Sequence, residues 1–328
     1  MTRPLTVTWF VPVRHRDWDR MPASVWNRCL QLHPYLERLG IRCLVNDRTA
    51  PAEVAVFVRM QDAPALGLAT EARGRGSRVV FDLCVDYFDV TGVLGDGYGV
   101  TLRHREECLA MTEVAHAVVA ASAFIAGRAK EFHRHVVYFP DSIDRAHFAW
   151  TKRYEPDRRR PPRAIWCGVG VKAPDLEPIL PLLRARDIPL TVIADTRPRL
   201  SGPSEWIRWH HATLPRDLLR GDVCVAPRDL GTSYNLGHSF FKIGIFLTQG
   251  IPALAAPVPS YAEVLHPGAT GLVCASRAEW EAGLDRVAAE PALLGTWSAA
   301  AAGVMRPYWS EHLAVEYARF FRDLADGP

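Results

Sequence analysis

The chain has 328 residues, of which 48% are hydrophobic and 23% are charged, and its formal net charge is +3 at pH 7. This length is sufficient for two domains with buried cores, and the composition excludes a disordered polypeptide. So small a net charge excludes a polyanion such as nucleic acid as the expected partner. The apolar stretch that begins at Ile243 is broken by Gly250, Pro252, Pro257 and Pro259, so no transmembrane segment is expected.

The seven cysteines are scattered, and none forms a Cys-x-x-Cys pair. They therefore indicate neither a structural zinc site nor a disulfide framework. Their odd number, together with the lack of a signal-peptide pattern, predicts a cytoplasmic protein.

Strand-like segments rich in β-branched residues alternate with helix-length segments, which predicts the α/β class with parallel βαβ units. The elements expected in the first half are a strand over 5–11, a helix over 25–39 capped by Ser24, strands over 41–45 and 54–58, a helix over 65–73, a strand over 78–83, a helix over 102–112, a strand over 117–120, a helix over 123–132 and a strand over 135–139. The loops at the carboxyl ends of these strands are expected to open on one crevice.

A charged, proline-rich stretch over 151–163 predicts the domain boundary. The elements expected after it are a strand over 163–167, a proline-interrupted helix, strands over 190–194 and 207–210, a helix over 214–220, a strand over 223–226, a buried helix over 240–248, a strand over 251–256, a helix from 261 and a long helix over 307–324. The expected domains are 1–150 and 151–305, followed by a helix over 306–328.

The segment 239–272 carries the strongest functional signal. Lys242 is the one charged residue of the buried helix, Gly250 closes that helix, and Ser260 is expected to cap the next one. The first backbone N–H groups of a helix attract anions. Lys242 and the helix start are therefore predicted to face one phosphate site, although a lysine with its stem packed down and its ammonium in solvent is the alternative.

The order of these parts resembles the carboxy-terminal half of GT-B glycosyltransferases, in particular the retaining family-4-like enzymes (glycosyl transferases group 1). The matching pieces are Lys242, Gly250-Ile251-Pro252, the strand over 253–256 and Tyr261-Ala262-Glu263, and the segment 136–148 resembles the one that closes the first domain of that family. The resemblance implies two Rossmann-like doubly wound domains that face a cleft, with the last helix crossing back to the first domain. It also implies a glycosyltransferase of the hexosyltransferase type.

The resemblance implies that a nucleotide-sugar donor binds the second domain and a small-molecule or glycan acceptor binds the first. The residues expected at the donor are Lys242, Lys172, Glu263, Gly170, Ser260, Tyr261 and Ala262, with Asn235, His238 and Ser239 in a polar loop. Glu263 is equally well interpreted as an ordinary first-turn glutamate, and a lone His238 as a structural group. The residues expected at the acceptor are Arg14, His15, Asp17 and Asp82.

The stereochemistry expected from the resemblance is retaining, with no metal and no cofactor other than the nucleotide-sugar co-substrate. Asp86 or His15 is the expected base if the reaction inverts. The chain departs from the family where two glutamates usually flank the buried helix, because Gly237 and Ile245 stand there. This departure keeps a noncatalytic nucleotide-sugar-binding relative as an alternative, and the oligomeric state stays open.

A second alternative is an NAD-dependent oxidoreductase. Gly168-Val169-Gly170 follows a strand and Asp195 ends the next one, which is a passable dinucleotide fingerprint. Pro174 and Pro178 oppose it, because they interrupt the helix start that would hold the pyrophosphate.

Overall fold

The computed structural model describes residues 4–13, 21–92, 99–155, 160–290 and 292–327. The chain divides into two compact units, and each is built around a parallel six-stranded sheet. The first unit comprises residues 1–144, 232–239 and 308–328, and the second comprises 145–231 and 240–307. The predicted α/β class and the two doubly wound sheets are confirmed.

The first unit begins at a buried strand and ends at the last helix of the chain. Its elements are β1 (Leu5–Phe10), α1 (Ala23–Val25), the π-helical η2 (Trp26–Leu30), α2 (His33–Arg38), β2 (Ile41–Val45), β3 (Val54–Val58), α3 (Ala63–Gly74), β4 (Arg78–Leu83), α4 (Leu102–Val114), β5 (Ala117–Ala120), α5 (Ala123–Ala129), β6 (Val136–Tyr138), α8 (Ser233–Leu236) and α12 (Ser310–Asp326).

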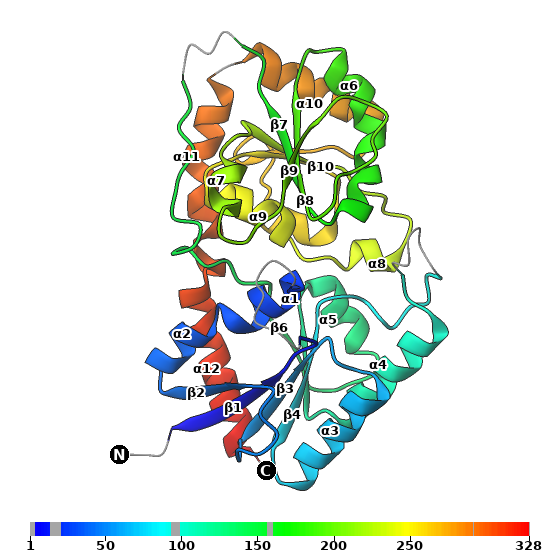
Figure 1. Ribbon diagram of the computed structural model, residues 1–328, viewed down its shortest axis with the longest axis vertical. Coiled ribbons are helices and arrows are strands. Elements are labelled where there is room, and N and C mark those ends of the chain that lie inside the picture. The colour runs from blue at the N-terminus through cyan, green and yellow to red at the C-terminus, as the bar shows by residue number, and fades with distance from the viewer. Residues whose placement is uncertain (1–3, 14–20, 93–98, 156–159, 291, 328) are drawn as a thin grey trace. The chain divides into compact units, whose positions relative to one another are not determined.

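The first sheet has the strand order β2-β1-β3-β4-β5-β6. The chain moves one way from β1 to β2 and the other way from β3 onward, so right-handed crossovers place α2 on one face and α3, α4 and α5 on the other. Figure 1 shows this layering, and α12 packs beside α2. The strand β3 is apolar on both sides, with Val56 and Phe57 both fully buried, because helices cover both faces of the sheet.

The second unit restarts the alternation after the proline-rich segment. Its elements are β7 (Ala164–Cys167), the 3₁₀ helix η3 (Gly170–Ile179), α6 (Leu180–Arg184), β8 (Leu190–Ala194), β9 (Glu205–Arg208), α7 (Leu214–Leu218), β10 (Val223–Ala226), α9 (Phe241–Thr248), β11 (Ala253–Ala255), the 3₁₀ helix η4 (Pro259–Glu263), β12 (Gly271–Val273), α10 (Arg277–Ala289) and α11 (Leu293–Met305), and η5 (Arg306–Tyr308) leads to α12.

The second sheet has the strand order β12-β11-β10-β7-β8-β9. β7 and β10 are neighbours, and the chain leaves them in opposite directions. The helix between β10 and β11 is α9, which ends as predicted at Gly250, where φ is +72°. A side chain at Gly250 would meet the Ser298 hydroxyl at 2.6 Å, so close packing as well as backbone geometry favours glycine there.

Two local predictions in the first unit are wrong. The helix expected over 25–39 is divided into α1, η2 and α2, and Pro34 in the first turn of α2 brings no N–H donor to continue the preceding helix. Ser24 lies inside α1 and does not cap it, because the N-cap position is Pro22.

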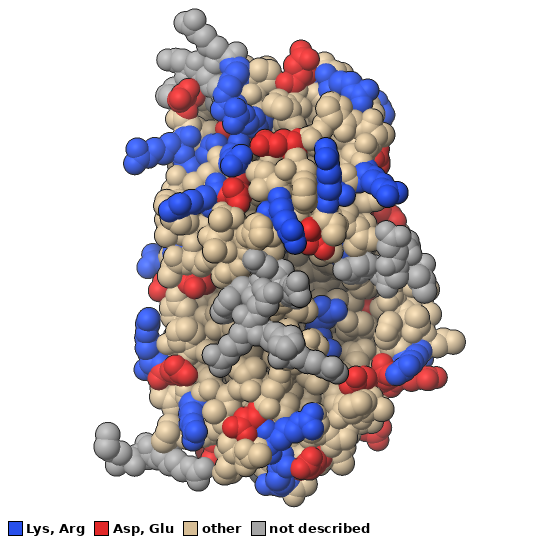
Figure 2. Space-filling view, viewed as in Figure 1, with Lys and Arg blue, Asp and Glu red and all other residues tan. Residues whose placement is uncertain are grey.

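The described surface carries charges of both signs. Figure 2 shows basic and acidic side chains interspersed over the face in view. No helix in the described part of the chain is both long and apolar enough to cross a bilayer.

Candidate functional site

The neighbouring strands β7 and β10 define the topological switch point of the second sheet, where open α/β sheets bind ligands outside the carboxyl ends of their strands. Gly168 directly follows β7, and Arg228 follows β10 by two residues. The residues that surround Gly168 therefore decide what this edge of the sheet can bind.

Lys242 lies in the first turn of α9, and its ammonium reaches this edge. The rest of α9 packs into the unit, since residues 243–248 are all buried. The Nζ atom lies 4.0 Å from the centroid of the Trp166 ring on β7, which is a cation–π contact. Nζ is covered, and among the described residues it has no hydrogen-bond partner. An ammonium normally donates three hydrogen bonds, so this one has donors that no described residue uses.

The charge on Lys242 is poorly stabilised in the unliganded protein. Burial, followed by the positive charge of Arg228, lowers the pKa of Lys242 to about 7, while the Asp175 carboxylate opposes the shift. The cluster thus contains two cations, Lys242 and Arg228, and one carboxylate, Asp175. A bound anion would offset the desolvation of the ammonium and the repulsion between the two cations.

Anion binding at this cluster is therefore expected to depend on pH through Lys242. A bound phosphate raises the pKa of Lys242 above 7, so the complex takes up a proton between pH 7 and the pKa of the bound state. The affinity for a nucleoside diphosphate should fall by up to about ten-fold for each pH unit above 7. Titration calorimetry from pH 6.5 to 9 measures this slope. The same titration of Lys242→Met gives the pH dependence that arises from ionisation of the ligand itself. Parallel pH profiles for the wild type and Lys242→Met would contradict the assignment.

Gly168 allows the backbone to approach the Trp166 ring and the ammonium. A Cβ atom at Gly168 would lie 2.6 and 2.7 Å from two carbons of the Trp166 ring and 3.0 Å from Lys242 Nζ. The Trp166 ring is fully buried and has no free space to move into. The turn after β7 therefore needs glycine for a packing reason that only the structure reveals.

Gly168→Ala is expected to weaken anion binding by displacing the Trp166 ring and, with it, the Lys242 ammonium. Overpacking of this kind costs about 1–3 kcal/mol, so both the unfolding midpoint and the affinity for a nucleoside diphosphate should fall. The matched control is Gly127→Ala in α5, where an added Cβ meets nothing within 4 Å. Wild-type affinity in Gly168→Ala would show that the turn does not shape the site.

Tyr261 belongs to the same cluster through its phenol, and not through the backbone N–H group that was expected to bind an anion. Burial raises the pKa of its phenol to about 12, and a hydrogen bond links the phenol to Arg228. Its backbone N–H already donates to Val258 at 2.9 Å. The prediction that Ser260 caps a helix is wrong, because η4 is a five-residue 3₁₀ helix whose N-cap is Val258. Ser260 is buried within it.

The other residues predicted at the donor lie in three places. Ala262 is exposed and Glu263 is half-buried at the end of η4. Lys172 is half-buried in η3, where its N–H donates to Val169. Asn235, His238 and Ser239 belong to the segment 232–239, which clusters with the first unit. In that segment the Nδ1 atom of His238 lies 2.7 Å from the carbonyl oxygen of Tyr234.

The turn after β7 does not fit a dinucleotide. Gly170 opens the 3₁₀ helix η3, which contains Pro174 and Pro178, so no α-helical N-terminus is available for a pyrophosphate. The Asp195 carboxylate, which would have to bind a ribose, instead accepts a hydrogen bond from the Gly170 N–H at 2.7 Å. These features oppose the oxidoreductase alternative.

The first unit has a cavity of about 820 Å³ at its own switch point. The cavity lies outside the carboxyl ends of β1 and β3, which are neighbours from which the chain leaves in opposite directions. Val11, Arg59 and Gln61 follow these strands and line it, together with Tyr87 and Tyr234. Arg59 and Gln61 were not predicted as functional residues.

The two aspartates predicted in this unit lie in its interior. Asp82 is fully buried and bonded to Arg28, so its position gives no support to a contact with the acceptor. Asp86 is also fully buried, where one carboxylate oxygen accepts from the Phe88 N–H at 2.9 Å and the other lies 3.7 Å from Arg128 Nε. Burial raises the pKa of Asp86, but it does not line the described cavity. Arg14, His15 and Asp17 lie outside the described residues.

No family model matches the chain, and a search of curated proteins finds no match. Solved structures match over nearly the whole chain. A glycosyltransferase from Rickettsia africae matches with a TM-score of 0.67 at 10% identity, covering 99% of this chain and 100% of that one. Sucrose-phosphate synthase from Thermosynechococcus elongatus matches with a TM-score of 0.65 at 13% identity, covering 98% and 99%.

HepE from Anabaena, solved in complex with UDP and glucose, matches with a TM-score of 0.65 at 9% identity, covering 97% of this chain and 100% of that one. The fold of the chain is therefore that of the GT-B glycosyltransferases, as the sequence resemblance implied. At this level of identity the likeness concerns the fold, and the activity must be argued from the chain's own residues.

Proposed function

We propose that the chain is a glycosyltransferase that moves a sugar from a nucleotide-diphosphate sugar to a hydroxyl group of an acceptor. The observation that carries the proposal is the covered Lys242 ammonium, which lacks a hydrogen-bond acceptor among the described residues and lies beside the Gly168 turn. Arg228 supplies a second cation to the same cluster. This arrangement suits a ligand with more than one negative charge.

The chemistry requires such a site. As the bond between the sugar and the diphosphate breaks, negative charge builds on the leaving phosphate oxygens, and preorganised cations stabilise that charge. Lys242 is the proposed principal contact, and Lys172 and Glu263 are proposed to contribute at the diphosphate and the sugar. UDP is the first nucleotide to test, because HepE was solved with it.

We expect retention of configuration without a bound metal. In a retaining reaction the departing diphosphate oxygen accepts the acceptor's proton on the face from which it leaves, so no protein carboxylate is required as a base. This agrees with the interior positions of Asp82 and Asp86. Proton NMR of the first product formed would report the anomeric configuration directly.

A panel of nucleoside diphosphates and nucleotide-sugars tests the proposal by thermal shift. A ligand at 100 times its dissociation constant stabilises a protein by about 2.7 kcal/mol, which is readily detected. Binding of a nucleoside diphosphate without the matching monophosphate would support the diphosphate site, and tight NAD binding alone would favour the oxidoreductase. Binding of a nucleotide-sugar with no hydrolysis or transfer in an acceptor screen would indicate a noncatalytic relative.

A further inference from the structure

Arg59 lines the cavity of the first unit in an unusual backbone conformation. It follows β3 directly, and its φ is +54°, in the left-handed region that non-glycine residues seldom occupy. Its N–H donates to the Asp82 carbonyl at 3.1 Å, which holds the backbone in place. Such strain costs about 1–3 kcal/mol and is concentrated at ligand-binding positions.

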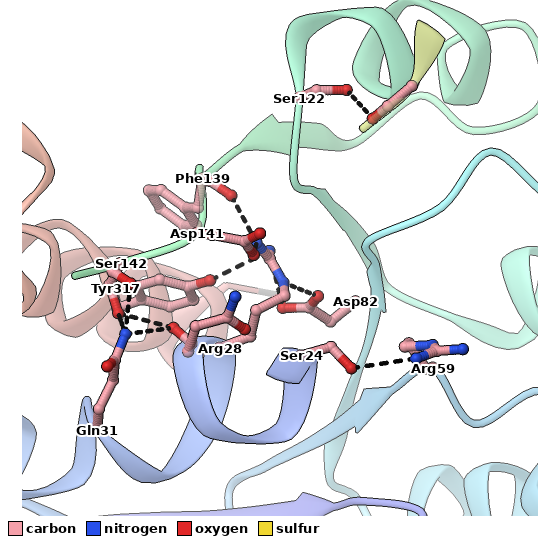
Figure 3. A network of polar contacts seen from close by, with 12 residues as sticks. Ser24, Arg28, Gln31, Arg59, Asp82, Ser122, Phe139, Asp141, Ser142 and Tyr317 are labelled. Atoms are coloured by element: carbon pink, nitrogen blue, oxygen red, sulfur yellow. Dashed lines mark hydrogen bonds and ion pairs between the residues drawn. The ribbon is translucent and has the colours of Figure 1, made fainter. Parts of the chain in front are cut away.

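The guanidinium of Arg59 has neutral neighbours. One terminal nitrogen donates to the Ser24 hydroxyl at 3.4 Å, as Figure 3 shows, and a further hydrogen bond joins it to Tyr87. Its Nε atom is covered and has no hydrogen-bond partner within the described residues. A guanidinium stays charged at every physiological pH, so this position holds a permanent positive charge.

The carboxylates that line the same cavity already accept hydrogen bonds from residues other than Arg59. Asp62 caps α3 by accepting from the Ala65 N–H at 3.0 Å, and Glu107 accepts from Arg103 at 2.8 Å. The polar groups that act most strongly on Arg59 are the Cys84 thiol and the hydroxyls of Tyr87 and Tyr234, which are neutral at physiological pH. Arg59 therefore lines the cavity as a cation that forms no ion pair with a carboxylate of the described residues.

Gln61, which lines the cavity, also has an unused hydrogen-bond acceptor. The Nε2 atom of Gln61 donates to the His104 carbonyl at 3.1 Å, while its Oε1 atom is covered and unpartnered among the described residues. A ligand that carries both a negative charge and a hydroxyl group would complement the two side chains. Arg59 requires an acceptor from the ligand and Gln61 Oε1 requires a donor, so the pair restricts the ligand more than a single cation does.

From these contacts we infer that the acceptor is an oxyanion-bearing hydroxyl compound, such as a phosphorylated or carboxylated sugar, whose anionic group is held by Arg59 and whose hydroxyl is held by Gln61. This inference rests on the proposed function, because it names the acceptor of that reaction. The planar guanidinium can bind phosphate and carboxylate oxygens through paired N–H donors, which a neutral acceptor could not exploit.

The experiment compares glucose 6-phosphate, glucuronate and glucose as probes of the full chain. Calorimetry at fixed ionic strength gives their affinities, first without nucleotide and then with UDP. Hydrogen bonds to a charged group are expected to favour the anionic probe by about ten-fold or more over glucose. A preference for glucose 6-phosphate over glucuronate, or the reverse, identifies phosphate or carboxylate as the recognised group.

Three variants separate the role of Arg59 from a general effect of charge. Arg59→Asn suits the left-handed backbone and should remove the preference for the charged probe, while Arg59→Lys should keep part of it. Arg42→Gln removes one exposed cation from β2, away from the cavity, and should leave the preference unchanged. UDP affinity should be the same in all three variants.

The inference is overturned if neither anionic probe binds at millimolar concentration, if glucose binds as tightly as both of them, or if Arg59→Asn keeps the wild-type preference. Failure of the proposed function would look different, since UDP itself would then not bind, whatever the behaviour of the anionic probes.

Discussion

Lys242→Ala is expected to lower kcat/KM for glycosyl transfer by at least about 10², because loss of one preorganised contact to a developing negative charge typically has an effect of that size. The variant removes the Lys242 ammonium of α9, which lies beside the Gly168 turn and has no hydrogen-bond partner among the described residues. Steady-state rates of nucleotide release with a saturating acceptor measure the effect.

Stability measurements separate this loss from misfolding. A lysine whose pKa is lowered in the folded state binds fewer protons there than in the unfolded chain between pH 7 and 10.5. Its burial therefore opposes folding most strongly below pH 7, and this penalty decreases as the pH rises towards 10.5. Lys242→Met, which keeps the apolar stem, should raise the Tm at pH 6 by more than at pH 9 while losing activity.

Lys130→Ala is the matched control, because Lys130 is exposed in the first unit. It should retain wild-type activity and stability. Activity within a few-fold of wild type in Lys242→Ala, with nucleotide affinity unchanged, would show that the diphosphate is bound elsewhere.

Arg28→Met is expected to destabilise the first unit by about 3–5 kcal/mol, because it leaves buried carboxylates without a cation. Arg28 lies in η2 with 1% of its surface exposed. It donates to Asp82 through two nitrogens and to Asp141 at 2.9 Å, as Figure 3 shows. It also donates to the Phe139 carbonyl and to the Tyr317 hydroxyl of α12.

Urea unfolding of the full chain measures this loss. Arg28→Met combined with Asp82→Leu should recover part of the stability, because removal of both partners leaves fewer unpaired charges. The control is Arg75→Met, whose ion pair with Glu71 is exposed and should contribute at most about 0.5 kcal/mol. A loss below about 1 kcal/mol in Arg28→Met would contradict the assigned role of the network.

The sequence predicted the fold well because the fold depends on local patterns. Apolar runs such as 54–58 and 223–226 correspond to buried strands, and Gly250 stops α9 as its backbone geometry requires. The last helix returns to the first unit, as the resemblance implied. These features are determined by periodicity, by turn chemistry and by the order of the elements.

The candidate site was predicted only in part, because its partners come from distant segments. The sequence singles out Lys242 but gives no sign that Trp166 lies beneath its ammonium or that Arg228 stands nearby. Arg59 directly follows an apolar strand, a signal that becomes meaningful only once the strand order places this position at a switch point. Asp82 had a similar position in the sequence, yet the buried Arg28 holds it in the interior.

The central claim, that the second unit binds a diphosphate through Lys242, is tested most directly by a crystal structure of the chain with UDP. We predict a phosphate oxygen about 2.7–2.9 Å from Lys242 Nζ, beside the turn at Gly168. UDP bound with its phosphates remote from both residues, while Nζ still lies against the Trp166 ring with no anion in contact, would contradict the claim.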